Sequence, residues 1–403
     1  MSTEAGMSLL EQLKKVPDPR IERTRRHELM DMLVIALCAV ICGADNWVDV
    51  VQFGKAKRAW FADFLKLPNG IASHDTFSRV FQLIDAQVLE RVCMAWLQSI
   101  AGKVEGVVAI DGKSVRGSRN GAMGPLHIVS AWACEASLLL GQVRTQEKSN
   151  EITAIPELLK LLSIQGCIVT IDAMGCQKAI TQAIVDGKAD YVLNLKANHR
   201  HLHGEVAAWF QSHTNEHSHT GQGYFEEDAS VNNHGRSERR GCWLMAVPEH
   251  LQRATKHWAN LQSIAMVRRQ RQEGERSSDE THYYISSLPV EVGAQAIAKA
   301  IRSHWAVENS LHWSLDVSFK EDASKVRKDH GPANMACMRR LALTQLKRET
   351  SLQKASIQTK RHRAGWDTDY MEKVLGIRAI APKLIAVVFP GLSPRNRYPS
   401  QRG

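Results

Sequence analysis

Two aspartates follow the most strand-like apolar runs of the sequence, and together they could support metal chemistry. Asp111 follows residues 107–110, and Asp172 follows residues 168–171. Short apolar runs that are rich in β-branched residues and closed by glycine are typical of central strands. If the two strand ends lay side by side, their carboxylates would repel each other unless a divalent cation lay between them. The alternative is an ordinary turn after each strand.

A third carboxylate, Glu308, lies in a segment with helical periodicity, residues 301–316. Two stripes run along this segment at four-residue steps: an apolar one of Val307, Leu311 and Leu315, and a polar one of His304, Glu308 and His312. Residues four apart lie close together on a helix surface. We therefore expect Glu308 to lie beside a buried stripe as a third metal ligand, the alternative being a partly buried polar seam.

The segment that must position the two aspartates, residues 105–200, alternates between strand-like and helix-like patterns. Expected strands cover residues 107–110, 127–134, 138–144, 168–172 and 191–195, and expected helices cover residues 151–162 and 177–185. Because 136 residues separate Asp172 from Glu308, we expect an insertion at about residues 202–290. Its short β-like pieces predict that this insertion is mostly β.

Residues 1–100 have mainly helical patterns, and Trp60, Phe61 and Phe64 suggest that this part has a core of its own. A helix with Arg79 follows a Pro-Asn-Gly turn and could read DNA; the alternative is an ordinary helix of a bundle. Residues 376–403 hold four prolines and are expected to form a loosely ordered tail. The catalytic part would then span residues 101–375.

These residues occur within phrases that together resemble the DDE transposases of bacterial insertion sequences, most closely the H-repeat-associated branch. The resemblance covers roughly residues 8–375. The phrases that carry it lie at residues 17–20, 26–29, 38–44, 70–76, 109–116, 148–152, 172–174, 194–198, 234–238 and 304–313. Their number and their order along the chain make the match specific.

The resemblance implies an α/β fold: an RNase H-like catalytic core with a mostly β insertion and an N-terminal helical domain. In that core the first and fourth strands are neighbours, which would bring Asp111 and Asp172 together. With Glu308 they would be the catalytic acids and would hold two Mg²⁺ ions, for which Mn²⁺ could substitute. Partners would be the DNA of transposon ends and target, bound by a homodimer.

Several cations are candidates for holding DNA phosphates, although each could also be a solvated surface charge. Related enzymes carry Tyr, Arg and Lys where this chain has Ile301, His304 and Leu315, so the cation that meets the phosphate is left open. The DNA-binding candidates are Lys113, Arg116, Lys196, Arg302, His304, Lys320 and Arg79.

Composition agrees with a polyanionic partner. The 403 residues carry a formal net charge of +10, which favours phosphate-rich ligands. No run of 18 apolar residues and no secretory signal pattern is found, and the eight cysteines contain no Cys-x-x-Cys pair. We therefore expect no membrane span and a cytoplasmic, nucleoid-associated protein. Two other functions are compatible with the same residues: a metal-dependent nuclease on this fold, or an inactive transposase relic that only binds DNA.

Overall fold

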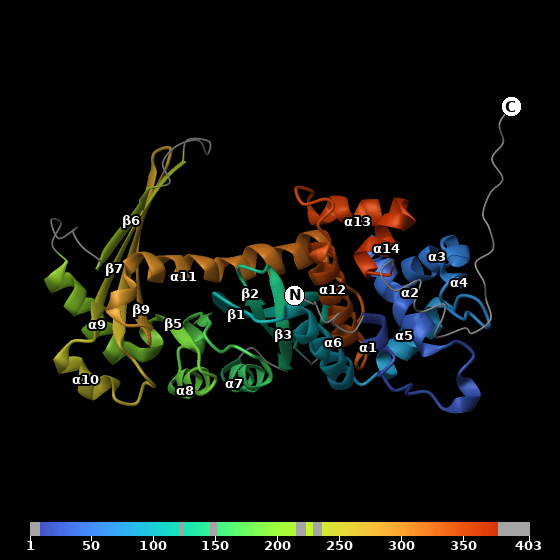
Figure 1. Cartoon of the computed structure of the whole chain (residues 1–403), viewed down its shortest axis with the longest axis horizontal. Helices are drawn as coiled ribbons and strands as arrows, with labels where there is room; N and C mark the ends of the chain where they lie inside the picture. Colours follow the sequence, from blue (N-terminus) through green and yellow to red (C-terminus); the bar gives the residue numbers. More distant parts are fainter. Residues whose placement is uncertain (1–8, 121–123, 146–150, 215–222, 229–235, 378–403) are drawn as a thin grey trace, which may run out of the picture.

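The computed structural model describes residues 9–120, 124–145, 151–214, 223–228 and 236–377. The molecule is elongated (Figure 1). The segment between residues 200 and 286 forms a β-rich end, and the first and last helices together form a helical end. The remaining strands lie between the two ends. The expected tail, residues 376–403, falls almost wholly outside the described residues, apart from Gly376 and Ile377.

One nine-stranded sheet runs through the molecule in the order β3-β2-β1-β4-β5-β9-β8-β7-β6. The strands are β1 (Val107–Val115), β2 (Leu126–Ala133), β3 (Leu138–Thr145), β4 (Ile168–Ile171), β5 (Asp190–Leu195), β6 (Tyr224–Asp228), β7 (Arg236–Ala246), β8 (Ser263–Glu273) and β9 (Arg276–Ser286). β1 pairs with β4 in parallel, as expected, and with β2 antiparallel. β5 pairs with β4 in parallel and with β9 antiparallel.

The expected end of β1 was wrong. We expected the strand to stop at Ile110, but it continues to Val115 because its second half pairs with β2, from Asp111 opposite Ser130 to Val115 opposite Leu126. Only the parallel partner β4 stops, at Ile171. Asp111 therefore lies within a strand, at the point where one of its two neighbours ends.

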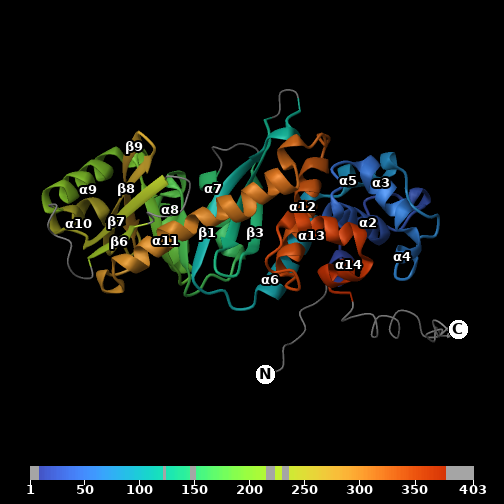
Figure 2. The ribbon, with the colours of Figure 1, turned by 90° about the horizontal axis from the view of Figure 1, so that it is seen from above.

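Helices cover both faces of the sheet. Figure 1 shows α7 (Glu151–Leu161) and α8 (Lys178–Asp186) below it, and α11 (Ala294–Ala306) above it. Successive residues of a strand face opposite sides. Val108 and Ile110 accordingly join the core between the sheet and helices α7 and α8, and odd-numbered residues of β1, including Asp111, point to the opposite side of the sheet, on which α11 lies. Seen from above, α11 runs along the molecule from the β-rich end toward the helical end (Figure 2).

The expected insertion extends the sheet. Its strands β6 to β9 continue outward from β5, and two helices, α9 (Arg200–His213) and α10 (Glu249–Thr255), pack beside them (Figure 1). The β-like pieces expected from the sequence, residues 242–247, 263–269 and 281–285, overlap β7, β8 and β9. The strands are longer, because pairing with neighbours carries each one past its apolar residues.

The first helices do not have a core of their own, contrary to our expectation. They are α1 (Leu9–Leu13), α2 (Leu29–Cys42), α3 (Trp47–Ala56), α4 (Arg58–Ala62), α5 (His74–Leu83) and α6 (Ala86–Ala101). One continuous apolar cluster joins them to the last helices, α12 (Gly331–Arg348), α13 (Ile357–Trp366) and α14 (Thr368–Leu375). α12 is buried along almost its whole length. Its Asn334 amide donates to the Phe81 and Ile84 carbonyl oxygens, at 2.7 and 2.8 Å.

Within the described part of the chain, no single helix has both the length and the apolar character needed to cross a membrane. α2 and α3 have that length and apolar character only when they are taken together, and the pair is bent by 98°.

Candidate active site

The two aspartates lie side by side because of the register between β1 and β4. Ile110 is opposite Ile171 in the last parallel pair, so Asp111 and Asp172 are the next residues on adjacent strands. Asp172 ends its strand and caps the short turn that follows: its Oδ1 accepts from the Met174 and Gly175 backbone N–H groups, at 3.0 and 3.3 Å. The pairing of β1 with β4 thus brings together the two acids that follow apolar runs in the sequence.

Glu308 comes from the helical segment that continues α11. The apolar stripe expected here is confirmed, since Val307, Leu311 and Leu315 are all buried. The expected regular α-helix is not: from residue 307 the chain forms π-helical turns, η7 (Val307–His312) and η8 (Ser314–Ser318). Such wide turns are rare and are often found at functional sites. Glu308 itself is exposed and lines a cavity together with Asp172.

The charges of Asp172 and Glu308 act on Asp111. Burial raises the pKa of Asp111 to about 7; the Gly112 backbone N–H lowers it, and the nearby charges of Asp172, Glu308 and Glu151 raise it further. A desolvated carboxyl surrounded by like charges favours either a proton or a cation. The structure thus provides a site where a positive ion would relieve the repulsion.

The three carboxylates do not, however, converge on one point. Among the described residues, no three His, Cys, Asp or Glu side chains are arranged to hold a metal ion. Two of the three acids accept hydrogen bonds from the backbone. Asp111 accepts from the Gly112 N–H at 2.9 Å, while Asp172 caps its own turn.

The two histidines of the polar stripe lie beside the aspartates. His312 Nδ1 is 3.4 Å from Asp111 Oδ2, and burial, with Arg340 and Lys113 nearby, lowers the pKa of His312 to about 3. His304 Nδ1 is 3.1 Å from Thr170 Oγ1, and burial lowers the pKa of His304 even though Asp172 opposes the change. Both rings are therefore neutral at pH 7. His304, expected to be a cation that meets a phosphate, carries no charge there.

A cavity of about 310 Å³ opens beside Asp172 and Glu308. It lies between α11 and the sheet from β4 to β9, and its cationic lining comes from Lys196, Arg240, Arg269 and Arg302. Lys196 and Arg302 were candidates from the sequence. Arg240 and Arg269 were not, although the basic run at residues 268–271 was a visible signal. Arg240 and Arg269 both pair with Glu238, and Arg302 pairs with Glu227.

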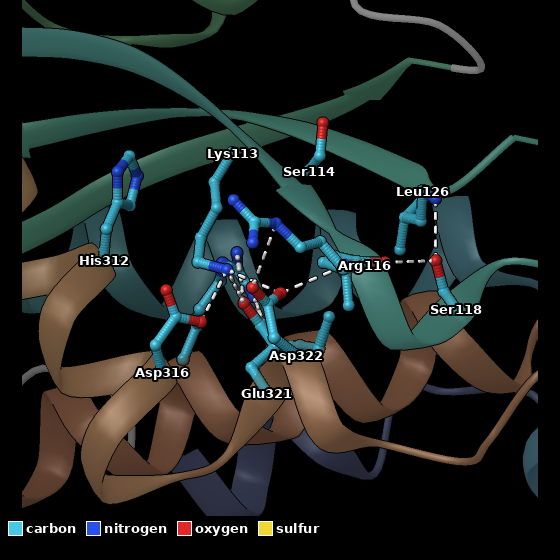
Figure 3. Close-up of polar contacts among 12 residues, drawn as sticks. Lys113, Ser114, Arg116, Ser118, Leu126, His312, Asp316, Glu321 and Asp322 are labelled. Carbon is cyan, nitrogen blue, oxygen red and sulfur yellow. Dashed lines mark hydrogen bonds and ion pairs between the residues drawn. The ribbon is translucent and has the colours of Figure 1, made fainter.

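The other cationic candidates are distributed over the molecule. Arg116 is 84% exposed near the end of β1, and Lys320 pairs with Asp45 at 3.0 Å. Arg79 is exposed on α5, at the helical end (Figure 1). Lys113 was expected to hold a DNA phosphate, but its side chain is only 7% exposed and lies against three carboxylates (Figure 3). It is buried because β1 continues beneath the segment that follows Glu308.

Glu151, the first residue of α7, was not among the candidates from the sequence. Its carboxylate lies on the far face of β1, against Gly112 and His127. A Cβ at Gly112 would lie 2.4 Å from Glu151 Oε1 and 2.5 Å from His127 Nε2, so a larger residue there would displace these two buried side chains. His127 Nδ1 in turn lies 2.9 Å from Ser114 Oγ. The one sequence signal for Glu151 was its place in the phrase at residues 148–152.

Two parts of the chain each match a known protein family. Residues 10–97 match "DDE_Tnp_1-associated", and residues 102–345 match "Transposase DDE domain". The protein named "Putative transposase YncI" of Escherichia coli O157:H7 is 38% identical over 374 residues, which cover 91% of this chain and 94% of that protein. The "H repeat-associated putative transposase YhhI" of E. coli K12 is 35% identical over 378 residues, covering 91% of this chain and 97% of that protein.

Two further similarities are weaker. The "Inactive transposase YbfQ" of E. coli K12 is 38% identical over 72 residues, which cover 18% of this chain and 86% of that protein. A solved piggyBac transposase synaptic complex with hairpin DNA aligns with a TM-score of 0.45 and 12% identity, covering 98% of this chain and 84% of that one. That structural likeness is too distant to bear on mechanism.

Proposed function

Since the chain belongs to the DDE transposase family, in its H-repeat-associated branch, we propose that it cuts DNA at the ends of an insertion sequence and joins the freed ends to target DNA. The observation that carries the proposal is the neighbouring placement of Asp111 and Asp172 on paired strands. Glu308 lies near enough for its charge to raise the pKa of Asp111. The strand order β3-β2-β1-β4-β5 supports an RNase H-like core.

The acids suit Mg²⁺, with Mn²⁺ as a substitute. Hard carboxylate oxygens are the ligands that Mg²⁺ prefers, and the buried Asp111 carboxyl has like charges around it that a cation would offset. Asp111, Asp172 and Glu308 would hold the ions. When bound, two such ions supply an activated oxygen nucleophile and stabilise the leaving oxygen.

In the first step a water oxygen bonds to phosphorus at the transposon end, and the bond to the 3′ oxygen breaks. In the second, the oxygen of the freed 3′-hydroxyl bonds to a phosphorus of the target DNA, the bond from that phosphorus to the target's 3′ oxygen breaks, and the target strand is left with a 3′-hydroxyl. Exposed Lys196 and Arg302, at the cavity beside Glu308, bind phosphates and orient the strand. Binding as a homodimer would hold two ends together, and Arg79 on α5 would add a contact at the helical end.

The experiment uses purified protein and DNA that carries the sequences flanking its gene. Asp111→Asn, Asp172→Asn and Glu308→Gln should each lower Mg²⁺-dependent cleavage by several orders of magnitude, because each removes a ligand of ions worth several kcal/mol to the transition state. DNA binding and folding should persist, as should cleavage by the control Glu291→Gln, which changes an exposed glutamate away from the acids.

Three outcomes would count against the proposal. Near-normal rates in two of the three acid variants would contradict the assignment of the acids. Cleavage without joining to a second DNA would indicate a nuclease, and end binding without cleavage in the unmodified protein would indicate a relic that only binds DNA.

A further inference from the structure

The ammonium group of Lys113 lies inside a cluster of acids. Its Nζ is 2.7 Å from Asp316 Oδ1, 3.2 Å from Asp322 Oδ1 and 3.6 Å from Glu321 Oε2. Figure 3 shows the side chain reaching from β1 toward these carboxylates. With its side chain 7% exposed, the lysine is enclosed by protein. To bind a DNA phosphate it would have to leave two part-exposed carboxylates and the completely buried Glu321, which would then keep Arg340 alone. Removing one partner from a buried ion pair is unfavourable.

The three acids come from the chain that follows Glu308. Asp316 lies in η8, and Glu321 and Asp322 lie in the short turn η9 (Glu321–Ala323). Glu321 is completely buried and binds Arg340 of α12, with Nη1 2.6 Å from Oε1. Despite burial, Arg340 and Lys113 lower the pKa of Glu321, so this carboxylate is charged. Lys113 and Arg340 thus hold the acid from two sides, one from the sheet and one from α12.

Lys113 also lies close to the first catalytic acid. It is two residues beyond Asp111 in β1 and therefore on the same face of the strand. Asp316 is eight residues beyond Glu308 in the same helical run, and His312 between them lies 3.4 Å from Asp111. The segment that carries Glu308 therefore meets the strand that carries Asp111 at two points, His312 with Asp111 and Asp316 with Lys113.

The end of β1 fits tightly against the same segment. A Cβ at Gly117 would lie 2.4 Å from the Ser324 carbonyl oxygen and 2.7 Å from that of Asp322. The Arg116 backbone N–H donates to Asp322 Oδ1 at 3.0 Å. These contacts hold the chain that follows the π-helical turns against the end of β1.

We propose that Lys113 is a positioning residue: its buried ammonium group, bound to Asp316, Glu321 and Asp322, fixes the segment that carries Glu308 against the strand that carries Asp111. The proposal deepens the proposed function and rests on it for the role of the two catalytic acids. It replaces a DNA-phosphate role for this lysine with an internal one.

The first test does not depend on cleavage. Hydrogen exchange, read by mass spectrometry on the full chain, compares the unmodified protein with Lys113→Met and with the control Lys325→Met, an exposed lysine just beyond η9. Lys113→Met should speed exchange at least about tenfold in peptides that cover residues 307–323, and Lys325→Met should not. Asp316→Asn, which removes one half-exposed partner, should show the same local effect more weakly and serves if Lys113→Met does not fold.

The second test separates positioning from phosphate binding. Under saturating DNA, Lys113→Met should slow single-turnover cleavage by about 10²-fold, the effect of a displacement near 1 Å. The salt dependence of end binding should stay unchanged, and Lys113→Arg should recover most of the rate because it restores the buried cation. A phosphate ligand would instead make the salt slope shallower by about one.

The proposal would be overturned if Lys113→Met made the salt dependence of end binding shallower without speeding hydrogen exchange at residues 307–323. Unchanged exchange and cleavage would also overturn it, as would exchange raised throughout the protein in both Lys113→Met and Asp316→Asn. If the unmodified protein cuts no DNA, the proposed function fails, while the exchange test still decides whether Lys113 holds the segment in place.

Discussion

Glu90 of α6 is a buried acid whose ionisation should weaken the fold. Its side chain is 10% exposed and lies beside Arg144 of β3, with Glu90 Oε2 3.5 Å from Arg144 Nε. Burial raises the pKa of Glu90 to about 7, although Arg144 and Arg340 oppose the rise. The ordinary value is 4.5, so the folded protein keeps this proton over a pH range in which the unfolded chain has released it.

The sign follows from proton linkage. Between pH 4.5 and about 7 the folded state binds more protons than the unfolded chain at this residue, so its contribution to stability is lost as pH rises. Above pH 7 the full loss is reached, about 3 kcal/mol for the difference between the two pKa values. Glu90→Gln has no proton to lose. It should therefore gain up to about 3 kcal/mol over the unmodified protein on going from pH 4.5 to pH 8.

Denaturant unfolding at a series of pH values between 4.5 and 8 measures the effect. The unfolding midpoint of Glu90→Gln, relative to the unmodified protein, should rise steadily across that range. The exposed-site control Glu291→Gln should show no such trend. If the midpoint difference for Glu90→Gln were the same at both ends of the range, burial would not govern this carboxyl and the reasoning would be wrong.

Two further changes test other parts of the structure. Gly112→Ala would place a Cβ 2.4 Å from Glu151 Oε1, so it should destabilise the protein by about 1–3 kcal/mol in denaturant unfolding. Gly204→Ala in α9, which meets nothing within 4 Å, should be neutral or stabilising, and an equal loss in both would contradict the steric argument. Arg79→Ala should weaken end binding and make its salt slope shallower by about one in a titration at several salt concentrations; an unchanged slope would remove Arg79 from the DNA interface.

Residue patterns alone were sufficient to locate the two strands that precede the aspartates, although not the end of β1. Residues 107–110 and 168–171 have the apolar, β-branched character of central strands, which does not depend on distant partners. The apolar stripe through Leu311 could likewise be predicted from nearby residues, and its burial is confirmed. The neighbouring position of β1 and β4 came from the family resemblance, because periodicity alone does not pair strands.

What could not be predicted depends on contacts that are distant in sequence. Lys113 looked like a surface cation, since the acids that bury it lie more than 200 residues later in the chain. His304 looked like a possible cation because burial, which keeps it neutral, is not visible in a local pattern. The π-helical turns at residues 307–318 could not be predicted for another reason. Residues four apart still share a face there, so the apolar stripe has the spacing of an ordinary α-helix.

The shared core of the first and last helices has a consequence for synthesis on the ribosome. α6 ends at Ala101 and α12 begins at Gly331, so the early helices emerge well before the helix that fills their core. At 5–20 residues per second, roughly 10–50 s pass between the two. During that interval the apolar faces of α2 and α5 have no final partner, and the nascent chain depends on chaperones or on temporary contacts. A message cut short before α12 would yield a chain whose first hundred residues cannot complete their fold.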